Sequence, residues 1–243
     1  DDPISKYIPN FPNGKRIELI HLLTHTSGIQ RPIWHKEDST TTDLMKEIEN
    51  RKVHFRAGSK WDYQDANYMV LGYILEKVTG ISLQDYIQKN IFDKANMVDS
   101  GFITSSLLTP ISSVGYLKDG KSFNPIRVYN AKLLFGCGDI YSTANDLALF
   151  DQALIHGKLV SYPSLKEMLV PGSASTYGMG LYNKGNVIFS HGNLGGFEAI
   201  HSFYKDGTSI AILLNVRDTS VNIFKTLSGI HQILITMGKT ISA

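Results

Sequence analysis

Three side chains have the chemistry of a proton-transfer site: Tyr63, Asp65 and His191. Tyr63 stands just ahead of a predicted helix, where a loop can present its phenol and a nearby cation can lower its pKa enough for it to act as a base. His191 ends a predicted strand, among glycines that let a ligand approach the backbone closely. From residue types alone two structural alternatives stay open: a packed tyrosine beside an aspartate that caps the helix, and a turn that holds an incidental histidine.

The sequence gives weaker support for metal or thiol chemistry than for proton transfer. His21 and His25 have the i, i+4 spacing of a zinc-binding pair on a helix, but Leu22 stands where a metalloprotease needs its glutamate. We therefore assign both histidines structural roles and expect no metal. The single cysteine, Cys137, has no histidine beside it in sequence and is interpreted as a small buried thiol.

The composition limits the classes of function. The 243 residues include 24 Lys plus Arg and 22 Asp plus Glu, a formal net charge of +2. This balance gives no electrostatic basis for binding nucleic acid, and no apolar run approaches the roughly 18 residues of a membrane span. Because the chain opens on Asp1-Asp2-Pro3 without an initiator methionine, we expect it to belong to a longer protein.

The elements that must position these side chains are helices first and strands last. Apolar periodicity predicts a helix over about 67–78, and Ser82 and Thr143 are predicted to cap two further helices. A weak hairpin is expected around 118–120. Strands are predicted over 177–182, 187–190, 198–204 and 209–216, with a tight turn at 205–208. An amphipathic helix over 219–237 closes the chain, with apolar residues that include Phe224, Leu227, Ile230 and Leu234.

Five stretches then stand out, in this order: Asp-Asp-Pro-Ile-Ser-Lys-Tyr-Ile-Pro at 1–9, Leu-Leu-Thr-His-Thr-Ser-Gly at 22–28, Tyr-Gln-Asp-Ala-Asn-Tyr at 63–68 with Leu-Gly at 71–72, Gly-Asp-Ile-Tyr-Ser-Thr-Ala-Asn-Asp-Leu at 138–147, and His-Gly-Asn at 191–193 followed by Gly196. Together they resemble the serine β-lactamase and penicillin-binding-protein superfamily, in particular its class C β-lactamase, DD-peptidase and esterase branch. The second stretch is highly specific, and the short motifs are convincing mainly through their placement.

The resemblance implies an α/β (α+β) fold of the β-lactamase/transpeptidase type, in which helices flank an antiparallel sheet beside a mostly helical lobe. Residues 1–243 would form a single, N-terminally incomplete domain, with the helical lobe at about 17–170 and the sheet and closing helix at about 176–240. The cleft between the lobes would bring Tyr63, Asp65 and His191 together, with Tyr63 and His191 within hydrogen-bond or one-water reach.

The resemblance also implies three catalytic motifs: Ser-x-x-Lys, Tyr-x-Asn and Lys/His-Thr-Gly. Tyr63 matches the second, with Asp65 where Asn is usual. His191 matches the first position of the third, with Gly192 and Asn193 where Thr and Gly are usual. The backbone around Gly192, Asn193 and Leu194 would bind substrate or an oxyanion. Loss of the Thr hydroxyl would weaken binding of a substrate carboxylate. The resemblance therefore argues against efficient β-lactam hydrolysis.

The first motif is missing. Only Ser202 and Lys205 have its spacing, and on a predicted strand residues i and i+3 point to opposite faces. We therefore expect the nucleophile outside this chain, which alone would be inactive. In the complete protein a serine would attack an amide, lactam or ester through an acyl-enzyme, without a cofactor. The substrate stays open among D-alanyl peptide, β-lactam, short ester and D-amino-acid amide. The alternative function is a non-catalytic binder of a peptide or partner.

Two further expectations follow from the resemblance. The sheet and closing helix would keep an open edge and an uncovered apolar face, which invite pairing with the chain's own missing N-terminal segment or with a second chain. The family usually works outside the cytoplasm, so the expected location is extracytoplasmic, either secreted or membrane-anchored.

Overall fold

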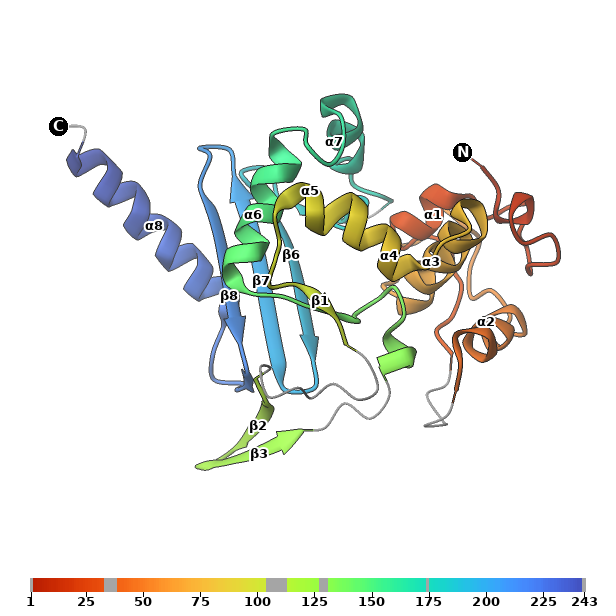
Figure 1. The fold of residues 1–243 in the computed structure, drawn as a ribbon, viewed down its shortest axis with the longest axis horizontal. Helices are drawn as coiled ribbons and strands as arrows, with labels where there is room; N and C mark the ends of the chain where they lie inside the picture. The colour runs from red at the N-terminus through yellow and green to blue at the C-terminus, as the bar shows by residue number, and fades with distance from the viewer. Residues whose placement is uncertain (1, 33–38, 104–112, 127–130, 174, 242–243) are drawn as a thin grey trace.

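The computed structural model describes residues 2–32, 39–103, 113–126, 131–173 and 175–241, so Asp1 of the first stretch lies outside it. Helices and a sheet occupy different parts of the molecule (Figure 1). The helical part contains α1 (Leu19–Leu23), α2 (Thr41–Glu49), α3 (Asp65–Thr79), α4 (Leu83–Ile87) and α5 (Asp93–Ala95), with short 3-10 turns at Ile4–Lys6 and Ala131–Leu134 and a π turn at Gln88–Phe92.

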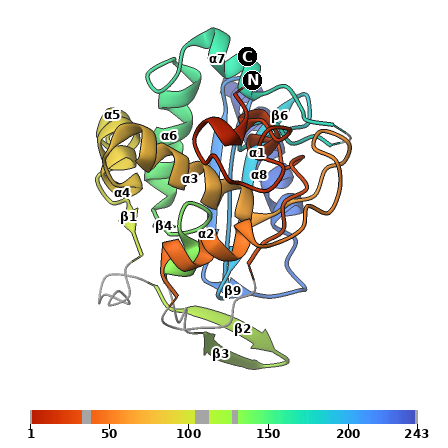
Figure 2. The same ribbon diagram turned by 90° about the vertical axis from the view of Figure 1, so that its right-hand side faces the viewer.

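Two further helices, α6 (Ala144–Ile155) and α7 (Tyr162–Met168), lead to the sheet. The predicted caps are confirmed, because Ser82 Oγ accepts from Asp85 N and Thr143 Oγ1 accepts from Asp146 N. The core of the helical part joins α1, α2 and α3 with the N-terminal segment, through Ile4, Ile17, Leu22, Leu44, Met69 and Val70. Figure 2 shows these helices grouped in front of the sheet.

The main sheet has four antiparallel strands in the order β5–β6–β7–β8: β5 (Tyr182–Asn183), β6 (Val187–Leu194), β7 (Phe197–Tyr204) and β8 (Ser209–Leu214). The predicted turn at 205–208 does join β7 to β8. The predicted strand at 177–182 is wrong over most of its length, since Tyr177 makes only an isolated bridge to Tyr182. The predicted strand at 187–190 is too short, because pairing with β7 continues to Leu194.

The two faces of the sheet bury alternate residues against different helices. On one face Phe189 and Ile200 pack with Ile223 and Leu227 of α8 (Ile223–Ile241). On the other face Ile188 and Phe203 pack with Leu154 of α6 and with residues of α7. The alternation fixes which strand residues are available to the rest of the molecule.

A two-stranded arm extends below the sheet in Figure 1, and it is the predicted hairpin. It consists of β2 (Gly115–Asp119) and β3 (Ser122–Ile126), and β2 also pairs in parallel with β9 (Val216–Arg217). A Cβ added at Gly115 would lie 2.1 Å from the carbonyl oxygen of Gly195, so only glycine lets the arm approach the β6–β7 turn. A second small pair joins β1 (Gly101–Phe102) to β4 (Ile140–Tyr141).

The closing helix is covered only over its first half, to about His231. Leu227 is buried, whereas Phe224, Ile233, Leu234 and Met237 are 40%, 60%, 43% and 56% exposed. Figure 1 shows α8 leaving the sheet obliquely, with its C-terminal half apart from the other elements. The outer edge of β8 has no strand partner among the described residues. Among all the residues that the structure describes, no helix is both long and apolar enough to cross a membrane.

Candidate functional site

Tyr63 lies in the loop just before α3, and the residue is 46% exposed. The ring packs on His25, with centroids 4.1 Å apart, and meets Tyr177 edge-on at 6.1 Å. Desolvation raises the pKa of the phenol above its ordinary value of 10, and the nearby Asp65 carboxylate raises it further. The cation that would lower this pKa is not among the groups that act on Tyr63 in the described residues.

Asp65 is the first residue of α3, and Gln64 rather than Asp65 holds the cap position. The Asp65 carboxylate accepts no hydrogen bond from the described residues, so the structural alternative of a capping aspartate is not observed. Burial raises its pKa, and the charge of Arg31 opposes that rise. Asp65 also raises the pKa of the Cys137 thiol, whose main perturbation is burial, as expected for a packed thiol.

His191 lies inside β6 rather than at its end, because the strand runs on to Leu194. The incidental turn considered above is therefore not observed. His191 Nε2 is 2.9 Å from Glu198 Oε1 on β7, and its ring contacts Phe224 at 4.9 Å. The Glu198 carboxylate is hydrogen-bonded to Nε2 of His191, so Nδ1 is the ring nitrogen that can bind another group.

Gly192, Asn193 and Leu194 form the exposed end of β6. On one edge they pair with β7, while β5 reaches only Ile188 and Phe189 on the other. Beyond Phe189 that second edge has no strand partner in the part of the chain that the structure describes. A Cβ added at Gly192 would meet nothing within 4 Å, so the face of the sheet at this residue is open as well. The edge thus has the open N–H groups that an oxyanion site needs.

The two halves of the candidate site are connected through aromatic rings. Tyr177 contacts Tyr182 at 4.7 Å, and Tyr182 stacks on Phe189 at 4.9 Å, two residues before His191 on the same face of β6. Since Tyr63 contacts Tyr177, the rings lead from Tyr63 to the strand of His191. Within the described residues no hydrogen bond or ring contact joins Tyr63 to His191 directly, and their one-water approach stays a prediction.

Three residues around the site were missed by sequence reasoning. His25 was assigned a purely structural role, although it lies in the most specific stretch of the sequence. Tyr177 carried no signal beyond its place in a predicted strand. Glu198 could have been found from the hairpin, because it pairs opposite Asn193 and lies diagonal to His191 on the same face.

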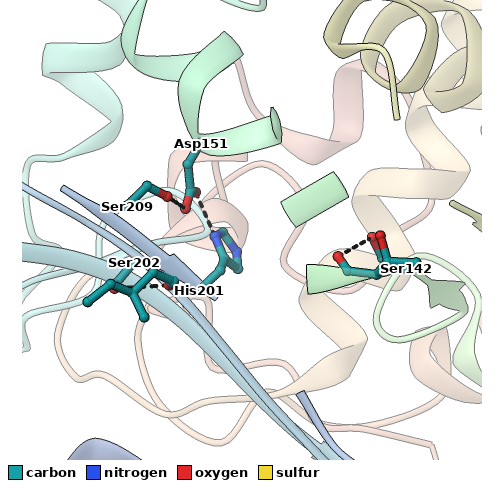
Figure 3. Close-up of polar contacts among 7 residues, drawn as sticks. Ser142, Asp151, His201, Ser202 and Ser209 are labelled. Carbon is teal, nitrogen blue, oxygen red and sulfur yellow. Dashed lines mark hydrogen bonds and ion pairs between the residues drawn. The ribbon is translucent and has the colours of Figure 1, made fainter. Parts of the chain in front are cut away.

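A second group of serine, histidine and aspartate side chains lies where α6 meets the sheet (Figure 3). Asp151 Oδ1 is 2.7 Å from His201 Nδ1, and Asp151 Oδ2 accepts from Ser209 Oγ at 2.9 Å. A catalytic triad needs its serine on the other ring nitrogen. Here Ser209 binds the aspartate instead, and the fully buried Ser202 bonds to Ile210 O. This cluster is therefore structural. The described residues also contain no group of three or more potential metal ligands.

The fold agrees with comparisons to known proteins. The profile of the family described as Beta-lactamase matches residues 1–225. The chain is 41% identical over 233 residues to a putative penicillin-binding protein, PbpX, of Bacillus subtilis (strain 168), and 27% identical over 221 residues to a teichoic acid D-alanine hydrolase of Staphylococcus aureus (strain MRSA252). These matches cover 96% and 89% of this chain, which spans 59% and 55% of the two relatives.

A solved structure shows the same fold. The penicillin-binding protein from Bacillus halodurans has a TM-score of 0.80 to this chain at 23% sequence identity, over 96% of this chain and 77% of the other. The family includes hydrolases, as the name of the staphylococcal relative states. The expected β-lactamase/transpeptidase-like fold, with helices around an antiparallel sheet, is confirmed. Since the family profile matches nearly all of it, this chain belongs to the Beta-lactamase family.

Proposed function

We propose that the complete protein is a serine hydrolase that cleaves D-alanyl esters or amides through an acyl-enzyme. One observation carries the proposal: Tyr63 and Asp65 stand together at the start of α3, and neither side chain forms a hydrogen bond with the described residues. Polar groups that are partly desolvated and left unpaired are typical of a site that binds its partner from outside.

The nucleophile belongs to the same proposal and lies outside these 243 residues. Its serine attacks the substrate carbonyl, and its proton passes through a lysine and the Tyr63 phenol to the leaving alcohol or amine. Water then attacks the acyl-enzyme and releases D-alanine. The proposal requires a cation near Tyr63, because burial raises the pKa of this phenol and a positive charge lowers it. The open edge of β6 near Asn193 binds the oxyanion.

The D-alanyl substrate is favoured by charge as well as by similarity. A D-alanyl ester carries an α-ammonium group, and the partly buried Asp65 carboxylate offers it an ion pair. A β-lactam instead presents a carboxylate, which Asp65 and Glu198 would repel. The staphylococcal relative is named for the hydrolysis of D-alanine from teichoic acid, which agrees with this choice.

The experiment compares D-alanine p-nitroanilide, its N-acetyl form and nitrocefin on the full-length protein. We expect the free-amino substrate to be preferred by kcat/KM, and a fluorophosphonate to label a serine upstream of these residues. Asp65→Asn should raise KM for the free-amino substrate about tenfold and leave the N-acetyl substrate unchanged. The matched control is Asp119→Asn, at an exposed position on the β2–β3 arm. A preference for nitrocefin would overturn the substrate assignment.

Absence of both labelling and turnover would instead support the non-catalytic binder. We also propose an extracytoplasmic location. The open edge of β8 would pair with a segment outside these residues or with a second chain.

A further inference from the structure

His25 has an unusual backbone conformation for a buried side chain. Its φ is 56°, in the left-handed region that few residues other than glycine adopt, and its side chain is 1% exposed. This turn directly follows α1, where Thr24 Oγ1 donates to Ile20 O at 2.7 Å. The left-handed turn at the end of α1 carries the imidazole into the protein, beneath the loop that carries Tyr63.

His25 holds the chain on both sides of Tyr63. Asp62 N donates to the carbonyl oxygen of His25 at 2.9 Å, and Gln64 N donates to His25 Nδ1 at 3.2 Å. Between these two bonds the imidazole packs on the Tyr63 ring at a centroid distance of 4.1 Å. The backbone and the ring of Tyr63 are therefore both fixed by a single residue, 38 positions earlier in the chain.

The hydrogen bonds also define the form of the imidazole. Asn67 Oδ1 accepts from Ser27 Oγ at 2.5 Å, which directs Asn67 Nδ2 toward His25 Nδ1 at 2.9 Å. A ring nitrogen that accepts from both Gln64 N and Asn67 Nδ2 carries no proton. His25 is therefore neutral with its proton on Nε2, an atom that is buried without a hydrogen-bond partner in the described residues.

We infer that His25 is the positioning residue for Tyr63: as a neutral acceptor and a packing surface, it fixes the phenol where proton transfer occurs. This rests on the proposed function, in which Tyr63 passes the proton of the nucleophile. Displacing a reacting group by about 1 Å lowers a rate about 10²-fold without removing any substrate contact. Loss of His25 should therefore reduce kcat and leave KM within about twofold.

Two substitutions separate the contributions of His25 in the full-length protein. His25→Phe keeps a ring against Tyr63 but removes the acceptor, and should lower kcat for D-alanine p-nitroanilide about 10²-fold. His25→Asn keeps an acceptor near the Nδ1 position, and asparagine tolerates the left-handed backbone. This variant should therefore lose less kcat than His25→Phe does. The control is His54→Asn, an exposed position whose side chain lies outside this network. Far-UV circular dichroism and the thermal midpoint establish that each variant folds.

A double-mutant cycle distinguishes positioning from general stabilisation. If His25 acts through Tyr63, His25→Phe causes no further loss of kcat in a Tyr63→Phe background. Independent, additive losses would overturn the inference, and so would wild-type kcat in His25→Phe. If Tyr63→Phe alone has no effect, the proposed role of Tyr63 fails instead.

A measurement that needs no turnover tests the geometry directly. ¹⁵N NMR of the histidine rings in the wild-type protein should show His25 with Nδ1 unprotonated and Nε2 protonated at pH 7. A proton on Nδ1 would overturn the inference even if His25→Phe failed to fold.

Discussion

Glu198 lies diagonally across the β6–β7 ladder from His191, and its Oε1 is 2.9 Å from His191 Nε2. Both side chains are partly shielded, at 15% and 25% exposure. A carboxylate in this place orients the imidazole, because it accepts a hydrogen bond from Nε2. The residue that matches the third motif therefore has a hydrogen-bond partner on the neighbouring strand.

Glu198→Gln should lower kcat/KM for D-alanine p-nitroanilide roughly tenfold in the full-length protein. A neutral amide holds the imidazole less strongly than a carboxylate does, by about 1 kcal/mol or more. The same change in a His191→Gln background should have no further effect. Glu167→Gln, at an exposed position of α7, is the control. An equal loss with and without His191 would show that Glu198 works elsewhere.

Tyr63→Phe should lower kcat about 10²-fold or more, because it removes the hydroxyl that passes the proton. The ring contact with His25 should survive, so the thermal midpoint should stay close to that of the wild type. The measurement is steady-state turnover of the full-length protein, with the exposed Tyr162→Phe on α7 as the control. Unchanged kcat would remove Tyr63 from the mechanism.

His25 should make stability depend on pH. Burial lowers its pKa from 6.5 to about 4, against a weaker opposing effect of the Asp62 charge, with the phenols of Tyr63, Tyr68 and Tyr177 packed nearby. Between these values the unfolded chain binds a proton that the folded chain does not. The free energy of unfolding should therefore fall as pH falls from about 6.5 to 4, by at most about 1.4 kcal/mol per unit from this group.

Urea unfolding of wild type and His25→Asn at pH 7, 5.5 and 4.5 measures this dependence. The carboxylates titrate in both proteins, so the difference between them isolates His25. The wild type should lose more stability on acidification than the variant. Parallel curves would mean that His25 titrates normally in the folded protein.

The parts of the fold that the sequence predicted are those with local signals. The cap at Ser82 and the tight turn at 205–208 depend on a few neighbouring residues, and both form as expected. The length of β6 was underestimated, because Gly192 and Asn193 have low strand propensity and only pairing with β7 keeps them extended.

The candidate site was predicted by residue type more than by environment. Tyr63, Asp65 and His191 were selected from motifs, whereas the partners that define their chemistry come from distant segments. His25 and Asn67 are 42 residues apart, and their spacing in sequence carries no sign of the bond between them. Nor could the sequence show that burial by Tyr177 and its neighbours raises the pKa of Tyr63.

The 243-residue chain alone should self-associate at micromolar concentration, since α8 exposes Ile233, Leu234 and Met237 and the outer edge of β8 has no strand partner among the described residues. Leu234→Lys combined with Ile233→Lys should shift sedimentation toward the monomer. Val78→Lys, at an exposed apolar position of α3, is the control and should leave the distribution unchanged. A monodisperse wild-type monomer would contradict this prediction.

The same chain should not turn over D-alanine p-nitroanilide or react with a fluorophosphonate. Ser202 is fully buried on β7, with its hydroxyl donated to Ile210 O, so it cannot serve as a nucleophile. Mass spectrometry after fluorophosphonate treatment should find no adduct. Labelling that Ser202→Ala abolishes would show that this serine is reactive after all.

The β2–β3 arm has a consequence for the order of folding. Its parallel pairing with β9, and the Lys118–Asp218 ion pair at 2.6 Å, join segments a hundred residues apart. Such contacts need a large loop to close first, whereas the β6–β7 and β7–β8 hairpins close loops of a few residues. The close contact of Gly115 with Gly195 further requires that the β6–β7 turn already exists. We therefore expect the arm to dock late on the folding pathway and to detach early when the native state opens locally.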